Sequence, residues 1–141
     1  MLEGIPPILP PELLKGLMEM GHGDELVLAD GNFPKFAHPA NVIRLDGHGI
    51  PEILDAILKF MPLDPYVEHP TIFMEVLPDD PYQPEIWPRY REIGAKYEKD
   101  GLREIAINKF EFYERAKKAY AVVATSEAAL YANMILKKGV V

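Results

Sequence analysis

The sequence predicts an α/β fold in which helices cover both faces of a mostly parallel sheet. Short apolar runs that are typical of buried strands alternate along the chain with segments whose apolar residues recur at helical spacing. Such alternation favours parallel strands, because a helix between two strands returns the chain to the starting edge of the sheet. No internal repeat and no linker interrupts the pattern, so residues 1–141 are expected to form one domain.

The N-terminal part predicts a helix followed by a buried strand. Pro10 and Pro11 suit the first turn of a helix, where a missing N–H costs nothing. Apolar residues then follow at helical spacing up to Gly21 and Gly23, which are typical of a helix end. The apolar run within residues 25–30, bounded by turn sequences on both sides, predicts the first strand.

The middle of the chain predicts two more strands and a helix between them. Residues 42–45 form a short apolar strand that a glycine-rich turn ends. In residues 50–61 the apolar side chains recur at i, i+3 and i+4, which is typical of an amphipathic helix, and Pro62 ends it. Residues 71–77 carry the next strand.

The C-terminal part predicts two more helices and three more strands. Residues 84–99 favour a helix that starts later if Pro88 lies in its first turn. Residues 109–118 form the other helix. The strands are expected at residues 103–107, 120–125 and 133–137. The second of these strands is expected to be the best buried in the sheet.

Composition and charge exclude several classes of function. Of the 141 residues, 48% are hydrophobic and 26% charged, which is ordinary for a globular protein with a sizeable core. The net charge of −7 leaves no basic excess for nucleic acid. The chain has no cysteine, which excludes disulfides and thiolate metal ligands. No signal-peptide pattern and no apolar run near the roughly 20 residues that span a bilayer are present, so a cytoplasmic protein without membrane contact is expected.

His22 and Asp30 flank the first predicted strand and are candidate acid/base residues. Imidazole titrates near neutral pH, so a positioned histidine can give and take a proton. A carboxylate at the carboxyl end of a parallel strand lies where ligands bind in open α/β sheets, and it can accept hydrogen bonds from sugar hydroxyls. The sequence alone equally allows an exposed histidine at a helix end and a turn-forming aspartate before Gly31.

Tyr131 and Ala132 precede the last predicted strand, Asn133 begins it, and the three form a second candidate segment. Tyrosine can stack on a sugar face and donate a hydrogen bond, and asparagine can both donate and accept. The alternative is an ordinary turn before a strand. The four histidines have no spacing typical of metal ligands, so no metal site is expected, and loop positions in solvent are favoured for His38, His48 and His69.

Taken together and in this order, these stretches resemble the sequences of one family, the sugar mutarotases that comprise L-fucose mutarotase and D-ribose pyranase. The stretches that carry the resemblance read PELLKGLMEMGHGDELVLADGNFP, VIRLDG, FEFYERAKKAYAVVATSE and LYANMILKKGVV. They run over nearly the whole chain. The stretches VIRLDG and NKFEFYERAKKA are more similar to the fucose branch than to the ribose branch.

The resemblance implies a fold, an assembly and a set of roles. It implies a three-layer α/β/α sandwich with a mixed, mostly parallel sheet and no metal or organic cofactor. It also implies a ring-like homo-oligomer, typically a decamer, with sites near subunit borders. His22 matches the family's proton donor, and Asp30 matches a substrate-binding carboxylate. The segment expected to contact the substrate is Tyr131, Ala132 and Asn133.

Lys109 departs from the fucose branch, which usually carries arginine at this position. Arginine offers a planar fork and lysine a point charge, so we expect this position to tune the choice of sugar. The expected function is mutarotation, the interconversion of the α and β anomers of a reducing sugar, above all L-fucose, by acid/base ring opening and closure. Pyranose/furanose exchange of the D-ribose pyranase type and a non-catalytic sugar-binding module are the alternatives. The general base is open between water, Tyr131 and Tyr120.

Overall fold

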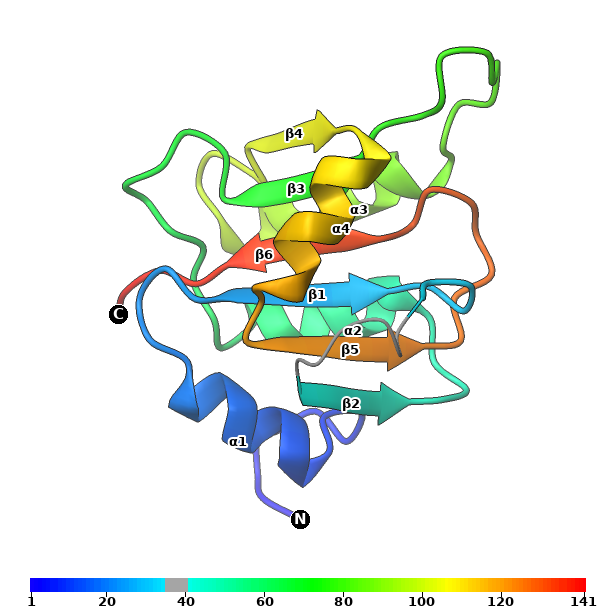
Figure 1. The fold of residues 1–141 in the computed structure, drawn as a ribbon. Coiled ribbons are helices and arrows are strands. Elements are labelled where there is room, and N and C mark those ends of the chain that lie inside the picture. The colour runs from blue at the N-terminus through cyan, green and yellow to red at the C-terminus, as the bar shows by residue number, and fades with distance from the viewer. Residues whose placement is uncertain (35–40) are drawn as a thin grey trace.

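A computed structural model describes residues 1–34 and 41–141, and in these residues six strands form one sheet (Figure 1). His38 lies outside the described residues. The strands are β1 Glu25–Ala29, β2 Asn41–Leu45, β3 Thr71–Met74, β4 Glu104–Ile107, β5 Ala121–Thr125 and β6 Met134–Lys137. Their order across the sheet is β2-β5-β1-β6-β3-β4.

The sheet is mixed and mostly parallel, which confirms the predicted fold class. β1 and β2 both pair with β5 in parallel, and β3 pairs with β4 in parallel. β6 runs antiparallel to both of its neighbours, β1 and β3. The reason is the short connection from β5, since residues 126–133 contain no helix that would carry the chain back across the sheet.

Four helices in the described residues cover the two faces of this sheet. They are α1 Pro11–Glu19, α2 Ile50–Leu58, α3 Ile86–Tyr97 and α4 Lys109–Lys117. α3 begins later than residue 84 and holds Pro88 in its first turn, as the position of that proline predicts. No helix in the described ranges is long and apolar enough to cross a membrane.

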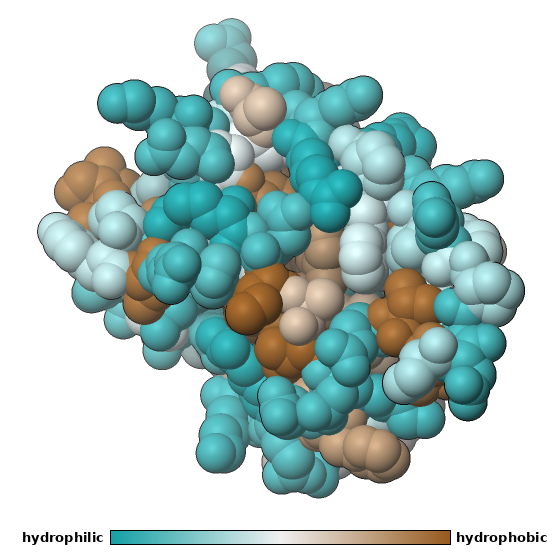
Figure 2. Space-filling view, turned by 90° about the horizontal axis from the view of Figure 1, so that it is seen from above, coloured by the Kyte–Doolittle hydropathy of each residue, from teal (hydrophilic) through white to brown (hydrophobic). Residues whose placement is uncertain are grey.

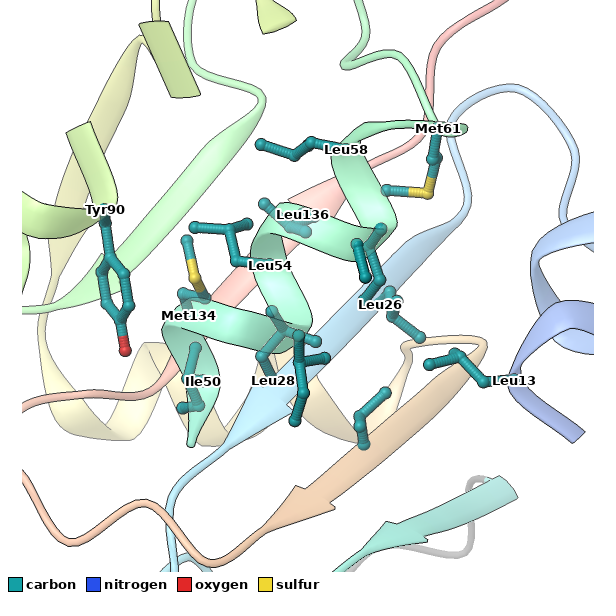
Figure 3. Close-up of a cluster of buried hydrophobic side chains, with 14 of the residues drawn as sticks. Leu13, Leu26, Leu28, Ile50, Leu54, Leu58, Met61, Tyr90, Met134 and Leu136 are labelled. Carbon is teal, nitrogen blue, oxygen red and sulfur yellow. The ribbon is translucent and has the colours of Figure 1, made fainter. Parts of the chain in front are cut away.

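Alternate residues of β1 point to two separate cores. Leu26 and Leu28 pack against side chains of α1, α2 and α3 (Figure 3), whereas Val27 and Ala29 pack on the face that Phe112 of α4 covers. These four residues of β1 are fully buried, because successive side chains of a strand point to opposite faces and helices cover both. The three-layer α/β/α arrangement follows.

The carboxyl ends of β1 to β5 all meet at one edge of the sheet. β6 is antiparallel to β1 and to β3, so β1 and β3 run in the same direction, and β4 follows β3. We call this edge the carboxyl edge and the opposite one the amino edge; they lie at the right and left of Figure 1. Seen from above, onto β4, hydrophobic side chains form separate patches among polar ones (Figure 2).

Candidate active site

Asp30 and Asn133 form a reciprocal pair at the carboxyl edge. Asp30 directly follows β1 and Asn133 directly precedes the antiparallel β6, so the two meet although 103 positions separate them. The Asp30 N–H donates to Asn133 Oδ1 at 2.7 Å, and Asn133 Nδ2 donates to Asp30 Oδ2 at 3.0 Å. Both residues are more than nine-tenths buried, with 8% and 6% exposed. The sequence prediction that these two residues share a site is consistent with this placement.

The Asp30 carboxylate places a negative charge in a largely buried environment. Its Oδ1 also accepts the N–H of Asn32 at 2.9 Å. Burial and then the Asp30 charge raise the pKa of Tyr113, whose ring meets Phe33 edge-on at 5.5 Å. Burial, with the charges of Glu127 and Asp30, also raises the pKa of Tyr90. An acceptor so placed can hold a sugar hydroxyl with a charge-assisted hydrogen bond.

Two aromatic side chains of α3 hold the backbone of Tyr131 and Ala132. Trp87 Nε1 donates to the carbonyl of Tyr131, and the Tyr90 hydroxyl donates to the carbonyl of Ala132, each at 2.8 Å. Tyr131 has a φ of 55°, a left-handed conformation that costs a non-glycine residue about 1–2 kcal/mol. Ala132 is fully buried, so it supports the segment from within the core.

The ring of Tyr131 contacts the segment after β3. Its hydroxyl donates to Asp80 Oδ2 at 2.6 Å, and its ring stacks on Tyr82 with centroids 6.1 Å apart. An open hollow of about 480 Å³ lies beside them, lined by Leu77, Pro78, Asp79, Asp80 and Pro81. In Figure 1 this green segment stands away from the sheet at the carboxyl edge. Asp80 thus positions Tyr131, a role for which the sequence gives no spacing signal.

Removing the Tyr131 hydroxyl is expected to raise the pKa of Asp80. The hydrogen bond from Tyr131 is the main cause that lowers this pKa, the Tyr82 N–H adds to it, and burial opposes it. A folded-state pKa below the unfolded one stabilises the protein above the unfolded pKa, and the effect is lost as pH falls through the folded pKa. Tyr131→Phe should therefore move the ¹³C carboxyl titration of Asp80 upward toward its ordinary 3.8 and lose this pH-dependent stability.

The matched control for that titration is Tyr82→Phe. The Tyr82 backbone N–H donates to Asp80 Oδ1 at 2.9 Å, and this donor remains when the hydroxyl is removed. The control should leave the pKa of Asp80 where it is. An unchanged Asp80 titration in Tyr131→Phe would contradict the assigned hydrogen bond.

Lys109 lies on the same edge as Asp30 but three strands away. It is the first residue of α4, which Asn108 caps by accepting the N–H of Glu111 at 3.0 Å. Neighbouring strands are about 4.8 Å apart, so the end of β4 lies about 14 Å from that of β1. The side chain is exposed, and its Nζ is 5.8 Å from the centre of the Phe110 ring. Asp30, Asn133, Tyr131 and Lys109 are the carboxyl-edge group.

His22 lies at the opposite, amino edge. It stands in the turn between α1 and β1, beside Gly23, whose φ of +87° suits glycine. Its Nε2 is 3.1 Å from Asp64 Oδ1, and the edge of its ring meets Tyr66 at 5.5 Å. Tyr120, which precedes β5, lies at the same edge and donates its hydroxyl to Glu19 at 2.5 Å. We call His22, Asp64, Tyr66 and Tyr120 the amino-edge group.

One chain does not bring His22 and Asp30 together. The five residues of β1 stand between them, and the first and last of these lie about 13 Å apart, because each of the four steps between them adds about 3.3 Å. Figure 1 shows the turn before β1 and the turn after it at opposite ends of the sheet. The two residues flank one buried strand as predicted, but within a single subunit they are parts of two separate groups.

The remaining histidines are dispersed. His48 Nδ1 lies 4.0 Å from Glu52, and His69 Nδ1 lies 3.0 Å from the carbonyl oxygen of Arg103. Within residues 1–34 and 41–141, no three His, Asp or Glu side chains are grouped so that they could hold a metal ion.

Comparisons with known proteins identify the family to which this chain belongs. The model of the RbsD / FucU transport protein family matches residues 3–141. The fucose mutarotase of Homo sapiens is 52% identical over 147 residues, which cover 99% of this chain and 94% of the human protein. Similarity over the whole length is what the four sequence stretches predicted.

Solved structures give the same result. The crystal structure of the fucose mutarotase in complex with L-fucose from Streptococcus pneumoniae superposes with a TM-score of 0.95 at 52% identity, covering 99% of each chain. The structure of Bacillus subtilis RbsD complexed with D-ribose is more distant, with a TM-score of 0.70 and 25% identity over 94% of this chain and 95% of that one. The predicted likeness to the fucose branch is thereby confirmed. The chain belongs to the RbsD / FucU transport protein family.

Proposed function

We propose that this protein is a cofactor-independent mutarotase that interconverts the α and β anomers of L-fucose. The observation that carries this function is the 52% identity and TM-score of 0.95 to a fucose mutarotase in complex with L-fucose. The carboxyl-edge group adds chemical support, because a buried carboxylate, an amide and a tyrosine ring are groups that recognise a sugar. The protein acts in the cytoplasm, where free monosaccharide is its substrate.

Mutarotation requires two proton movements on one sugar. The hydroxyl on the anomeric carbon loses a proton while the ring oxygen gains one; the bond between C1 and the ring oxygen breaks as the C1 carbonyl forms. The aldehyde end then rotates, and the ring closes on its other face. A positioned acid/base group contributes about 10²–10⁴-fold to such a step. His22 supplies the proton, while Asp30 and Asn133 hold hydroxyls and Tyr131 offers a ring face.

The catalytic site is completed by a second copy of the chain. His22 at the amino edge and Asp30 at the carboxyl edge meet the same sugar if the amino edge of one subunit contacts the carboxyl edge of the next. Such a head-to-tail contact joins two different surfaces, and when the rotation between successive subunits closes, its repetition forms a ring. The geometry of one subunit thus supports the ring-like homo-oligomer, typically a decamer, that the resemblance implies.

The test of the function is two-dimensional NMR exchange between anomeric signals of L-fucose, D-galactose and D-ribose. A catalytic amount of the protein should give exchange cross-peaks between the α and β pyranose signals, strongest for L-fucose. Heat-denatured protein serves as the control for spontaneous exchange. If no sugar of the three is accelerated, the enzyme hypothesis fails.

Pyranose/furanose exchange is the second candidate function, favoured by the likeness to RbsD complexed with D-ribose. The same spectra separate it, because D-ribose shows distinct pyranose and furanose signals. Acceleration between those signals, with slower exchange for L-fucose, would favour this candidate. Calorimetric binding of L-fucose without any exchange would instead identify a non-catalytic sugar-binding module.

A further inference from the structure

Tyr90 is a fully buried tyrosine of α3 whose hydroxyl the mechanism has not yet used. None of the residue is exposed, and its ring lies in the core that Figure 3 draws. There it packs against Phe73, with ring centroids 5.9 Å apart. The hydroxyl donates to the carbonyl of Ala132 at 2.8 Å. Ala132 stands between Tyr131 and Asn133, so this buried donor acts directly on the segment that the proposed function assigns to the sugar.

The surroundings keep this hydroxyl protonated. Burial and the negative charges of Glu127 and Asp30 raise the pKa of Tyr90, because each of them disfavours a phenolate. The hydroxyl therefore remains a donor over the neutral pH range, and it does not take a proton from a sugar. Its part in the site is to hold the chain in place.

The chain between β5 and β6 contains no helix or strand, and it is supported by α3. Within it, Tyr131 has the left-handed φ of 55°. Trp87 and Tyr90 are three residues apart and so lie on one face of α3. They hold two successive carbonyls, those of Tyr131 and Ala132. The second of these belongs to the peptide from which Asn133 continues, so the Tyr90 hydroxyl sets the orientation of that peptide.

Asn133 carries the effect of this peptide to Asp30. Its Oδ1 accepts the Asp30 N–H at 2.7 Å, and its Nδ2 donates to Asp30 Oδ2 at 3.0 Å. The side chain is short, so it reaches both atoms from only one position of its own backbone. A peptide turned away from Tyr90 would move the Asn133 amide off the carboxylate.

We infer that Tyr90 is a positioning residue of the sugar site, because its hydroxyl fixes the peptide from which Asn133 reaches Asp30. This rests on the proposed function, in which Asp30 and Asn133 hold sugar hydroxyls. Without the Tyr90 hydroxyl the chain divides its time between this arrangement and others. The apparent affinity for the sugar then falls with the fraction of molecules in the binding form. The chemistry of a bound sugar stays the same, because the proton donor His22 lies at the other edge.

Tyr90→Phe tests this role with the loss of one oxygen atom and an unchanged ring. Tyr97→Phe is the matched control, because it removes a hydroxyl from the last residue of the same helix, where the hydroxyl donates to Asp55. Ile93→Val is the second control. Ile93 is a core residue of α3 with 8% exposed, so the shorter side chain lowers the stability of the core without removing a hydrogen bond.

The first test is the exchange of the Asp30 N–H with solvent, followed in ¹H–¹⁵N spectra. This N–H is bonded to Asn133, whereas the neighbouring Gly31 N–H donates to the carbonyl of Glu127 at 2.8 Å and serves as the internal reference. Tyr90→Phe should speed the exchange at Asp30 about 3–10-fold relative to Gly31, the factor that one neutral hydrogen bond contributes. Neither control should change this ratio. A wild type whose Asp30 N–H exchanges as fast as an exposed amide overturns the inference even if no variant folds.

The second test is the rate of L-fucose anomer exchange by NMR over a range of sugar concentrations. Tyr90→Phe should raise KM by the same factor of about 3–10 and leave kcat near the wild-type value, so that saturating sugar restores the wild-type rate. Tyr97→Phe and Ile93→Val should keep the wild-type KM. A residue that only stabilised the fold would not separate KM from kcat in this way.

The outcomes separate the positioning role from its alternatives. If Tyr90→Phe folds and keeps both the wild-type KM and the wild-type exchange at Asp30, the hydroxyl does not position Asn133. If Ile93→Val raises KM as much as Tyr90→Phe, the effect comes from lost core packing and the inference is overturned. If the wild type does not accelerate anomer exchange at all, the proposed function fails, and the exchange at Asp30 alone then decides whether Tyr90 holds Asn133 as inferred.

Discussion

Replacing His22 with glutamine is expected to lower the rate of L-fucose anomer exchange by about 10²–10⁴-fold, the usual contribution of a general acid/base group. Glutamine can still form hydrogen bonds, but it cannot give and take a proton near neutral pH. Without that group, ring opening depends on water as it does in solution. The measurement is the exchange cross-peak intensity between the α and β signals at matched protein concentration.

The fold should tolerate this change. The His22 side chain is 46% exposed, and the amide NH₂ of glutamine can donate to Asp64 in place of the imidazole, so we expect little change in the free energy of unfolding. His69→Gln is the matched control, because His69 is also a partly exposed loop histidine and its contact is to the carbonyl of Arg103. The control should keep full activity. Full activity in His22→Gln with an unchanged circular dichroism spectrum would remove His22 from the mechanism.

Local sequence signals predicted every helix and strand of the described residues, but α2 ends at Leu58 and β3 at Met74, earlier than the predicted residues 61 and 77. Pro11 lies in the first turn of α1, and Pro88 lies in the first turn of α3, as expected from the missing proline N–H. The antiparallel β6 follows from a connection without a helix, which is also visible in the sequence. The order of strands across the sheet is decided by the packing of distant segments and has no local signal.

The candidate site was predictable only in part, for the same reason. Asp30 and Asn133 came from their positions at strand ends, but their pairing depends on β1 and β6 being neighbours. Asp64 stands beside Pro65 in a loop and has no local feature that predicts burial; the contact of that loop with Lys137 buries it. The left-handed φ of Tyr131 is unfavourable for tyrosine and has no local sequence signal; Trp87 of α3, distant in sequence, donates a hydrogen bond to the carbonyl of Tyr131.

Mixing two weakly active variants should restore activity if the site is shared between subunits. His22→Gln keeps the carboxyl-edge group, and Asp30→Asn keeps the amino-edge group while removing the charge that would hold a sugar hydroxyl. Asp30→Asn alone should lose about 10–100-fold, because a hydrogen bond to a charged group contributes about 1.5–3 kcal/mol. Each variant by itself therefore gives weak exchange, and neither can compensate its own defect within one chain.

Co-expressed or co-refolded at equal amounts, the two variants should recover up to about one quarter of wild-type exchange activity. A head-to-tail site is intact when His22 comes from an Asp30→Asn subunit and Asp30 from a His22→Gln subunit, and each choice has a probability of about one half in a random ring. The same mixture made with His22→Gln and the double variant His22→Gln/Asp30→Asn contains no intact His22 and should show no recovery. Activity of the mixture equal to the sum of the two separate variants would contradict a shared site. His22 of one subunit and Asp30 of another would then not act on the same sugar, just as β1 keeps the two residues apart within one chain.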